Sequence, residues 1–229
     1  MSTSLSRPKE PRRSSPPKRR GPGRPTAAAP GRRERLLEAA LALYSQVGIG
    51  AASLRDIAAR AHVTPAMVHY YFGSKDELRD AVVEERLMPL IGALGGGLEA
   101  AGSDPRELIT TFVGGMYAAV ARFPWLPSLW VREVLCENGA LRDVLVTRIA
   151  PQLPQLLAAR LAEAQKHGAL PADLDPRLLI VSLMGLTLLP FAAAPIWRRV
   201  FVAGDVDADK LLSHTLALLD HGIGGHRAK

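Results

Sequence analysis

Side chains of the types that contact DNA are concentrated between residues 53 and 75. Hydroxyl groups and cations suit the phosphate backbone, and the sequence offers five candidates for this role: Ser53, Arg55, Thr64, Tyr70 and Lys75. The candidates for contacts with base edges are Pro65, Ala66 and His69. Ala66 presents a methyl group that fits a thymine methyl, and His69 presents a ring nitrogen for a hydrogen bond. Neither reads a base with two hydrogen bonds, as Arg reads guanine, so specificity is expected to depend partly on DNA shape.

Two short helices joined by a tight turn would position these side chains. Ser53 is a good N-cap, and an apolar stripe of helical spacing follows it at Leu54, Ile57, Ala58 and Ala61. Thr64 and Pro65 form an N-cap and first-turn proline for a second helix, which Gly73 ends. Ser74 and Glu77 have the spacing of a capping box for the next helix. The outward face of the second helix then carries Pro65, Ala66, His69 and Tyr70, while Val68, Tyr71 and Phe72 face the core.

A third helix must cover the first two, because helices of about eight residues cannot bury a core alone. Residues 32–47 supply it, with apolar side chains at helical spacing that end at Gly48: Leu36, Leu37, Ala40, Leu41, Tyr44 and Val47. Three helices with a short turn between the second and third describe a helix-turn-helix domain, whose last helix can enter a major groove.

Residues 32–78 resemble the TetR family of bacterial transcriptional regulators. The matching features are the long first helix, Ser53-Leu-Arg-Asp-Ile-Ala, Val63-Thr64, the aromatic run from His69 to Phe72, and Lys75 before Leu78. Two departures concern His62, where the family commonly has Gly in the turn, and His69-Tyr70-Tyr71, where it commonly has Tyr followed by Tyr-His. The resemblance implies an all-α fold with a helix-turn-helix domain at 31–78 and a helical effector-binding and dimerisation domain at 79–229. It also implies a homodimer formed by the last two long helices of each subunit, a DNA partner, a small-molecule effector and, most commonly, repression.

The basic character of the chain lies at its N-terminus. The net charge is +7, yet residues 1–35 hold 11 of the 29 Lys and Arg residues against two acids. Residues 1–30 contain almost no large apolar side chain, which predicts a disordered basic arm. The segment around Arg24 looks like an AT-hook core, and an extended Arg in a narrow minor groove is electrostatically favoured; a plain solvated tail is the alternative.

Beyond residue 78 the sequence predicts further helices. One continues from Ser74 to about Leu94, bent at Pro89 and weakened or ended by the glycines at 95–97. A helix with Asp104 as its N-cap follows, then one at about 128–137 and one at 141–165 with kinks at its prolines. Residues 178–194 carry no charge, which indicates either a helix buried on nearly all sides or a membrane span, and the internal Pro190 and the length favour the buried helix. The last helix begins at Asp207 or Asp209.

An effector pocket is expected in this second domain, because it contains all three tryptophans together with methionines and several prolines. The residues predicted to line it are Met88, Phe112, Met116, Tyr117, Phe123, Trp125, Trp130, Met184, Phe191 and Trp197. For any single residue, helical spacing of such side chains more often reflects plain core packing than a pocket. The predicted effector is a small apolar or aromatic molecule.

Other classes of function find less support. The chain has no Gly-rich phosphate loop, no nucleophile elbow and no Cys/His metal spacing, so we expect no enzyme, no metal and no cofactor. The single cysteine, Cys136, excludes an internal disulfide, is expected to be a buried thiol, and together with the lack of an apolar signal segment suggests a cytoplasmic protein. Two alternatives stay open: an architectural DNA binder that uses the basic arm without sequence preference, and a membrane-associated protein that uses residues 178–194.

Overall fold

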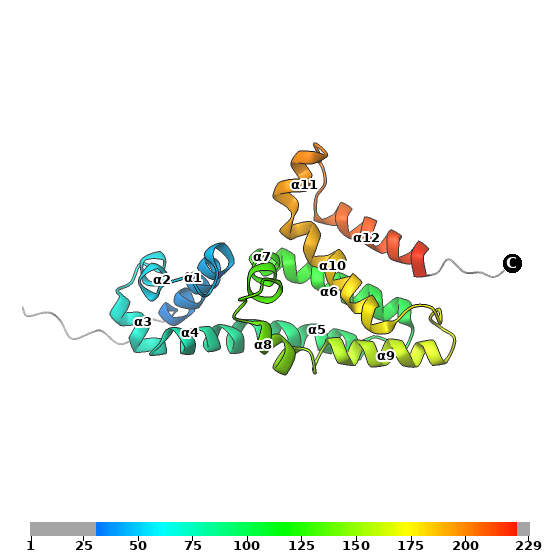
Figure 1. Cartoon of the computed structure of the whole chain (residues 1–229), viewed down its shortest axis with the longest axis horizontal. Helices are drawn as coiled ribbons and strands as arrows, with labels where there is room; N and C mark the ends of the chain where they lie inside the picture. Colours follow the sequence, from blue (N-terminus) through cyan, green and yellow to red (C-terminus); the bar gives the residue numbers. More distant parts are fainter. Residues whose placement is uncertain (1–30, 224–229) are drawn as a thin grey trace, which may run out of the picture. The chain divides into compact units, whose positions relative to one another are not determined.

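A computed structural model describes residues 31–223, and within this range every regular element is helical. The predicted all-α fold is therefore confirmed. In chain order the α-helices are α1 (Arg32–Val47), α2 (Leu54–Arg60), α3 (Pro65–Phe72), α4 (Lys75–Val82), α5 (Met88–Ala100), α6 (Pro105–Arg122), α7 (Leu126–Trp130), α8 (Arg142–Val144), α9 (Pro154–Lys166), α10 (Pro176–Ala192), α11 (Ala194–Val200) and α12 (Ala208–Ile223). Three π-helical turns lie among them: η1 (Val83–Leu87), η2 (Val131–Leu135) and η3 (Leu145–Ile149) (Figure 1).

The first three helices have the bounds and most of the caps that the sequence predicts. Ser53 caps α2 by accepting a hydrogen bond from the Asp56 amide, and Pro65 occupies the first turn of α3. Gly73 ends α3 with φ = 74°, a left-handed conformation that glycine adopts without strain. Thr64 precedes α3 with extended backbone but makes no side-chain cap.

A first hydrophobic core joins α1 to α2, α3 and α4. Leu36, Leu37, Leu41 and Tyr44 of α1 are fully buried in it. The same cluster extends to Leu87 in η1 and takes in Leu129 and Leu141 from the later part of the chain. The helix-turn-helix segment therefore shares its core with residues around α7 and η2.

The helix that begins at Lys75 is longer than predicted. It passes through η1 and continues as α5 to Ala100, so the expectation that Gly95–Gly97 would end it near Leu94 was wrong. Packing against α6 overrides the low helix propensity of the glycines, and the two helices approach so closely that a methyl group on Gly115 would lie 2.8 Å from Leu94. Pro89 sits in the first turn of α5 directly after the π-helical turn, and the Glu85 carbonyl, four residues earlier, accepts a hydrogen bond from the Arg86 guanidinium.

The predicted helix over residues 141–165 is two separate segments. The first consists of α8 and η3, the second is α9, and residues 150–153 form turns between them. Pro151 and Pro154 cannot donate backbone hydrogen bonds, and here they break the helix rather than kink it.

A second hydrophobic core lies among α5, α6, α9, α10 and α12. Its fully buried members include Leu98, Leu108, Leu157, Leu161 and Leu183. A buried hydrogen bond of 2.9 Å between the Tyr117 and Thr215 hydroxyls connects α6 with α12 inside this core.

Helix α10 is not buried on nearly all sides, contrary to the prediction for residues 178–194. Leu178, Val181 and Leu189 are 65%, 67% and 59% exposed, because the core of a single chain covers only the opposite face of the helix. Within the described residues no single helix meets the length and hydropathy of a membrane span; α10 and α11 meet them only when taken together, and they are bent by 74° at their junction.

Candidate nucleic-acid interface

The outward face of α3 has the exposure that contact with DNA requires. Pro65, Ala66, His69 and Tyr70 are all exposed, and Tyr70 is 74% exposed despite its size. The opposite face anchors the helix, because Val68 and Phe72 are buried in the first core. Tyr71 is half-buried and packs against this core, so its predicted core position agrees with the structure.

His69 is oriented by the end of its own helix. Its Nδ1 lies 2.6 Å from the carbonyl oxygen of Gly73, which can only accept a hydrogen bond, so Nδ1 carries the proton. The other ring nitrogen, Nε2, is then an acceptor in the neutral imidazole. An acceptor at this position matches the exocyclic amino groups that adenine and cytosine present in the major groove.

The predicted phosphate contacts differ in how far their polar groups are already engaged. The Ser53 hydroxyl accepts from the Asp56 amide at 3.1 Å and donates to the Asp56 carboxylate at 2.5 Å. The Thr64 hydroxyl makes no cap and is exposed. Arg55 is exposed, and no carboxylate of the described residues forms an ion pair with it. Thr64 and Arg55 thus retain donors for phosphate, whereas the Ser53 donor is already used.

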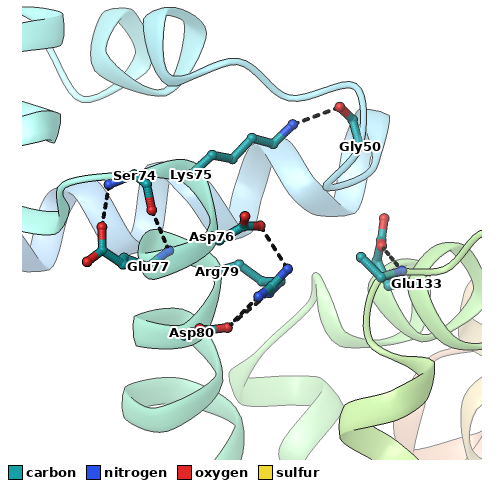
Figure 2. A network of polar contacts seen from close by, with 9 residues as sticks. Gly50, Ser74, Lys75, Asp76, Glu77, Arg79, Asp80 and Glu133 are labelled. Atoms are coloured by element: carbon teal, nitrogen blue, oxygen red, sulfur yellow. Dashed lines mark hydrogen bonds and ion pairs between the residues drawn. The ribbon is translucent and has the colours of Figure 1, made fainter.

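Lys75 makes a contact that the sequence did not indicate. Its ammonium donates to the carbonyl oxygen of Gly50 at 2.7 Å, which joins the start of α4 to the turn between α1 and α2 (Figure 2). The ammonium keeps two further N–H groups for a phosphate. No regular spacing connects positions 50 and 75, so periodicity could not have revealed this contact.

The first turn of α4 is held by the predicted capping box. The Ser74 hydroxyl accepts from the Glu77 amide at 3.1 Å, and the Glu77 carboxylate accepts from the Ser74 amide at 2.7 Å. Arg79, one turn later, lies 2.9 Å from both Asp76 and Asp80 (Figure 2). Since these carboxylates occupy Arg79, Lys75 is the cation at this helix start that is available for DNA.

Ion pairs fix the packing of α1 against η1. Arg86 pairs with Glu34 and, at 3.0 Å, with Glu38, while Arg33 pairs with Glu85. The hydrogen bond from Arg33 lowers the pKa of Glu85, so this carboxylate stays ionised at neutral pH. Each helix thus supplies an arginine to a carboxylate of the other, which stabilises the contact between α1 and η1.

The residues predicted to line an effector pocket fall into two groups. Phe112, Met116 and Tyr117 are buried in the second core, with Trp130, Met184 and Phe191 packed at its edge, and the Tyr117 and Phe191 rings meet edge-to-face at 5.2 Å. Met88 and Trp125 instead pack against the first core. The Phe123 and Trp125 rings lie tilted to one another with centroids 5.4 Å apart, and the Trp197 indole donates to the Pro190 carbonyl at 2.7 Å.

The described part of the chain has hollows on its surface, and the predicted residues line neither of the following two. One, of about 410 Å³, lies between the start of α6 and α12, where Arg106 pairs with Asp220. The other, of about 390 Å³, lies between α9 and the loop that leads into α10.

Arg24 and Cys136 were also singled out in the sequence. Arg24, the proposed minor-groove contact, lies outside the described residues. Cys136 is exposed rather than buried, because it follows the last residue of η2 with extended backbone and enters a surface turn. Within residues 31–223 no group of three or more His, Cys, Asp or Glu side chains is arranged to hold a metal ion.

Comparisons with known proteins agree with this geometry. Residues 36–82 match the family model described as bacterial regulatory proteins of the tetR family. The chain is 26% identical over 202 residues to the HTH-type transcriptional repressor KstR2 of Rhodococcus jostii (strain RHA1), which covers 88% of this chain and 96% of that protein. Two solved structures share the fold: the ketosteroid transcriptional regulator KstR2 of Mycobacterium tuberculosis (TM-score 0.68, 21% identity, 87% of this chain and 98% of that one) and the FadR regulator of Bacillus subtilis in complex with stearoyl-CoA (TM-score 0.63, 19% identity, 83% and 98%).

Proposed function

We propose that the chain, whose residues 36–82 match the tetR family model, is a TetR-family repressor that binds a near-palindromic operator as a homodimer and leaves it when a small apolar or aromatic effector binds. The observation that carries this proposal is the outward face of α3, where four exposed side chains stand on a helix anchored by Val68 and Phe72. A short helix presented in this way fits a major groove.

Base and phosphate contacts divide between α3 and its neighbours. Ala66 and His69 lie on the exposed face near the start of α3, so we assign them to base edges together with Pro65. Tyr70, Thr64, Arg55 and Lys75 supply hydroxyls and cations to the phosphates on either side. Ser53 contributes chiefly by capping α2, and Arg24 of the N-terminal arm remains a candidate for the minor groove.

Dimerisation through α10 and α12 explains the exposed apolar face of α10. Leu178, Val181 and Leu189 lie three, eight or eleven positions apart and so share one side of the helix. On α12, Leu218 is 51% exposed while Thr215 and Leu219 face the core of the same chain. Pairing α10 and α12 with those of a second copy buries both faces in a four-helix arrangement and places two recognition helices for two half-sites.

The effector site is proposed between α6 and α10, with residues 79–229 forming the domain around it. Met116 and Tyr117 of α6 and Phe191 of α10 meet there in an apolar environment with one hydroxyl pair, Tyr117 and Thr215, available to orient a ligand. One structural neighbour is described as a ketosteroid transcriptional regulator and another was solved in complex with stearoyl-CoA, whose acyl chain is apolar. A ligand that separates α6 from α10 would release the operator only to the extent that it prefers that conformer.

The test of DNA binding is a fluorescence anisotropy titration with the full chain. One duplex comes from upstream of its own coding region and the other is the same sequence scrambled, both at one near-physiological salt concentration. Sequence-specific recognition predicts about a thousandfold or greater preference for the upstream duplex. Equal affinity for both, together with equal affinity for any A·T-rich duplex, would instead support the architectural binder.

The effector is tested on the complex that this titration yields. Steroids and long-chain acyl-CoA compounds are added to the protein–DNA complex, and release is read as a fall in anisotropy. We expect release by an apolar compound, and a Tyr117→Phe variant should bind that compound more weakly because it loses one of the two hydroxyls. Release by polar metabolites alone would contradict the proposed pocket.

A further inference from the structure

Glu133 is a buried carboxylate in the π-helical turn η2, and it is only 4% exposed. Its Oε1 accepts a hydrogen bond from the Ile49 amide at 2.8 Å, and its Oε2 accepts one from the Ala140 amide at 3.0 Å. No Lys, Arg or His within residues 31–223 forms an ion pair with it. The carboxylate therefore depends on these two backbone donors to offset the cost of its burial.

The surroundings of Glu133 leave little room for displacement. A methyl group on Gly139 would lie 2.3 Å from the Glu133 carbonyl oxygen, so a larger residue at position 139 would clash with the Glu133 backbone. A methyl group on Gly48 would lie 3.0 Å from Oε1. Gly48 also has φ = 89°, which requires glycine, so the turn after α1 is shaped to bring the Ile49 amide onto the carboxylate.

A second contact runs beside the first. The Arg132 guanidinium, from the adjacent residue of η2, donates to the carbonyl oxygen of Ser45 in the last turn of α1 at 3.1 Å. Arg132 thus binds the Ser45 carbonyl at the end of α1, and its neighbour Glu133 binds the Ile49 amide in the turn that follows. We refer to Arg132 and Glu133 as the η2 clamp.

The turn held by the η2 clamp leads directly to the proposed DNA contacts. Gly50, the residue after Ile49, accepts the hydrogen bond from Lys75, and Ser53 caps α2 three residues further on. Figure 2 shows Lys75 extended toward Gly50 across the start of α4, with Glu133 on a separate helical segment. A shift of η2 would therefore move the turn that orients both Lys75 and the N-terminus of α2.

We propose that Glu133, supported by Arg132, is a positioning residue that couples the effector-binding part of the chain to the DNA-contacting turn at 48–50. The coupling rests on the proposed function, since it presumes that α3 and Lys75 meet DNA. By linkage it acts in both directions, so DNA that fixes the turn also fixes the segment from η2 to Ala140, which lies away from the proposed DNA contacts.

Amide hydrogen exchange measures this coupling without knowledge of the operator or the effector. The full chain is compared free and bound to a random-sequence duplex at low ionic strength, where phosphate contacts alone suffice for binding. Exchange is followed in segments 45–52, 64–75 and 131–141. The variants are Glu133→Gln and, as a matched control, Glu137→Gln, which makes the same chemical change on an exposed side chain four residues away.

In the wild type, DNA should slow exchange in 64–75 and also in 131–141. Glu133→Gln places an amide group opposite one of the two backbone donors, so the Ile49 amide of the free variant should exchange about tenfold faster or more. DNA should still protect 64–75 in this variant but no longer protect 131–141, while Glu137→Gln should behave as the wild type. A merely structural role would not remove the response to DNA in one segment and leave it in the other.

Three results would overturn the coupling. Protection of 131–141 that is unchanged in Glu133→Gln would show another route, and protection of 64–75 alone in the wild type would show that no coupling exists; in both cases DNA binding itself stands. Protection of neither segment would refute the proposed function, and the coupling with it. If Glu133→Gln fails to fold, Arg132→Gln removes the more exposed half of the η2 clamp and should reduce the DNA-induced protection of 131–141; unchanged protection would again refute the coupling.

Discussion

Replacing Lys75 by Gln should lower the salt dependence of DNA binding without changing its sequence preference. The ammonium of Lys75 uses one N–H on the Gly50 carbonyl and retains two for a phosphate. The substitution removes the cation, and the shorter glutamine side chain reaches less far toward the Gly50 carbonyl oxygen (Figure 2). Removing one neutralised phosphate lowers the slope of log affinity against log salt by about 0.9.

This slope change has a measurable size. Between 50 and 200 mM salt, the fall in affinity should be smaller for the variant than for the wild type by about 3.5-fold, which is the fourfold rise in salt concentration raised to the power of about 0.9. Because phosphate contacts carry no sequence information, the upstream and the scrambled duplex should lose affinity by the same factor.

The assay is an anisotropy titration of both duplexes at four salt concentrations, with Lys210→Gln as the control. Lys210 is an exposed lysine that pairs with Asp205 at 2.7 Å, away from α3. A salt slope for Lys75→Gln equal to that of the wild type, or an equal lowering of the slope by Lys210→Gln, would refute the phosphate contact of Lys75.

Three further substitutions follow from the described residues. The Tyr44 hydroxyl is buried without a hydrogen-bond partner in the described part of the chain, and burial raises its pKa to about 12, so above pH 10 the folded state keeps this proton while the unfolded state loses it. Between pH 9 and pH 12, the free energy of unfolding in urea should therefore fall by roughly 2–3 kcal/mol more for the wild type than for Tyr44→Phe. An equal fall for both proteins would contradict this. His62 is exposed at φ = 55°, so His62→Gly should raise the free energy of unfolding by about 1 kcal/mol, and a lower melting temperature would count against the strain. Val181→Glu should convert a dimer into monomers in sedimentation velocity, whereas Val146→Glu, a substitution at an equally exposed valine on η3, should leave the dimer intact; dissociation of both or of neither would refute the proposed interface.

The sequence predicted local structure well wherever a cap or a left-handed glycine fixed a boundary. Ser53 marks the start of α2, Gly73 the end of α3, and the Ser74–Glu77 pair the start of α4. These signals act over three or four residues and are therefore visible in the sequence. The exposed face of α3 followed from the same local periodicity.

Features decided by long-range packing were not predictable. The three glycines of α5 remain helical because the helix around them packs against α6 through Leu94 and Leu98, and residues 150–153 break a helix that periodicity alone continues. The contacts from Lys75 to Gly50 and from Glu133 to Ile49 join residues 25 and 84 positions apart, and no spacing rule indicates either. The lack of charge over residues 178–194 predicted a helix buried on nearly all sides, but hydropathy alone does not show which face of α10 the same chain leaves exposed.

Selection of DNA from a random-sequence library tests the central claim most directly, because it does not presume where the operator lies. The full chain is immobilised, bound duplexes are amplified and sequenced, and the stoichiometry of the enriched complex is measured by sedimentation. A homodimeric helix-turn-helix regulator predicts a near-palindrome with half-sites about one helical turn, or a multiple of it, apart and two chains on each duplex. Enrichment of A·T-rich DNA without a common sequence, or one chain on each site, would contradict the account.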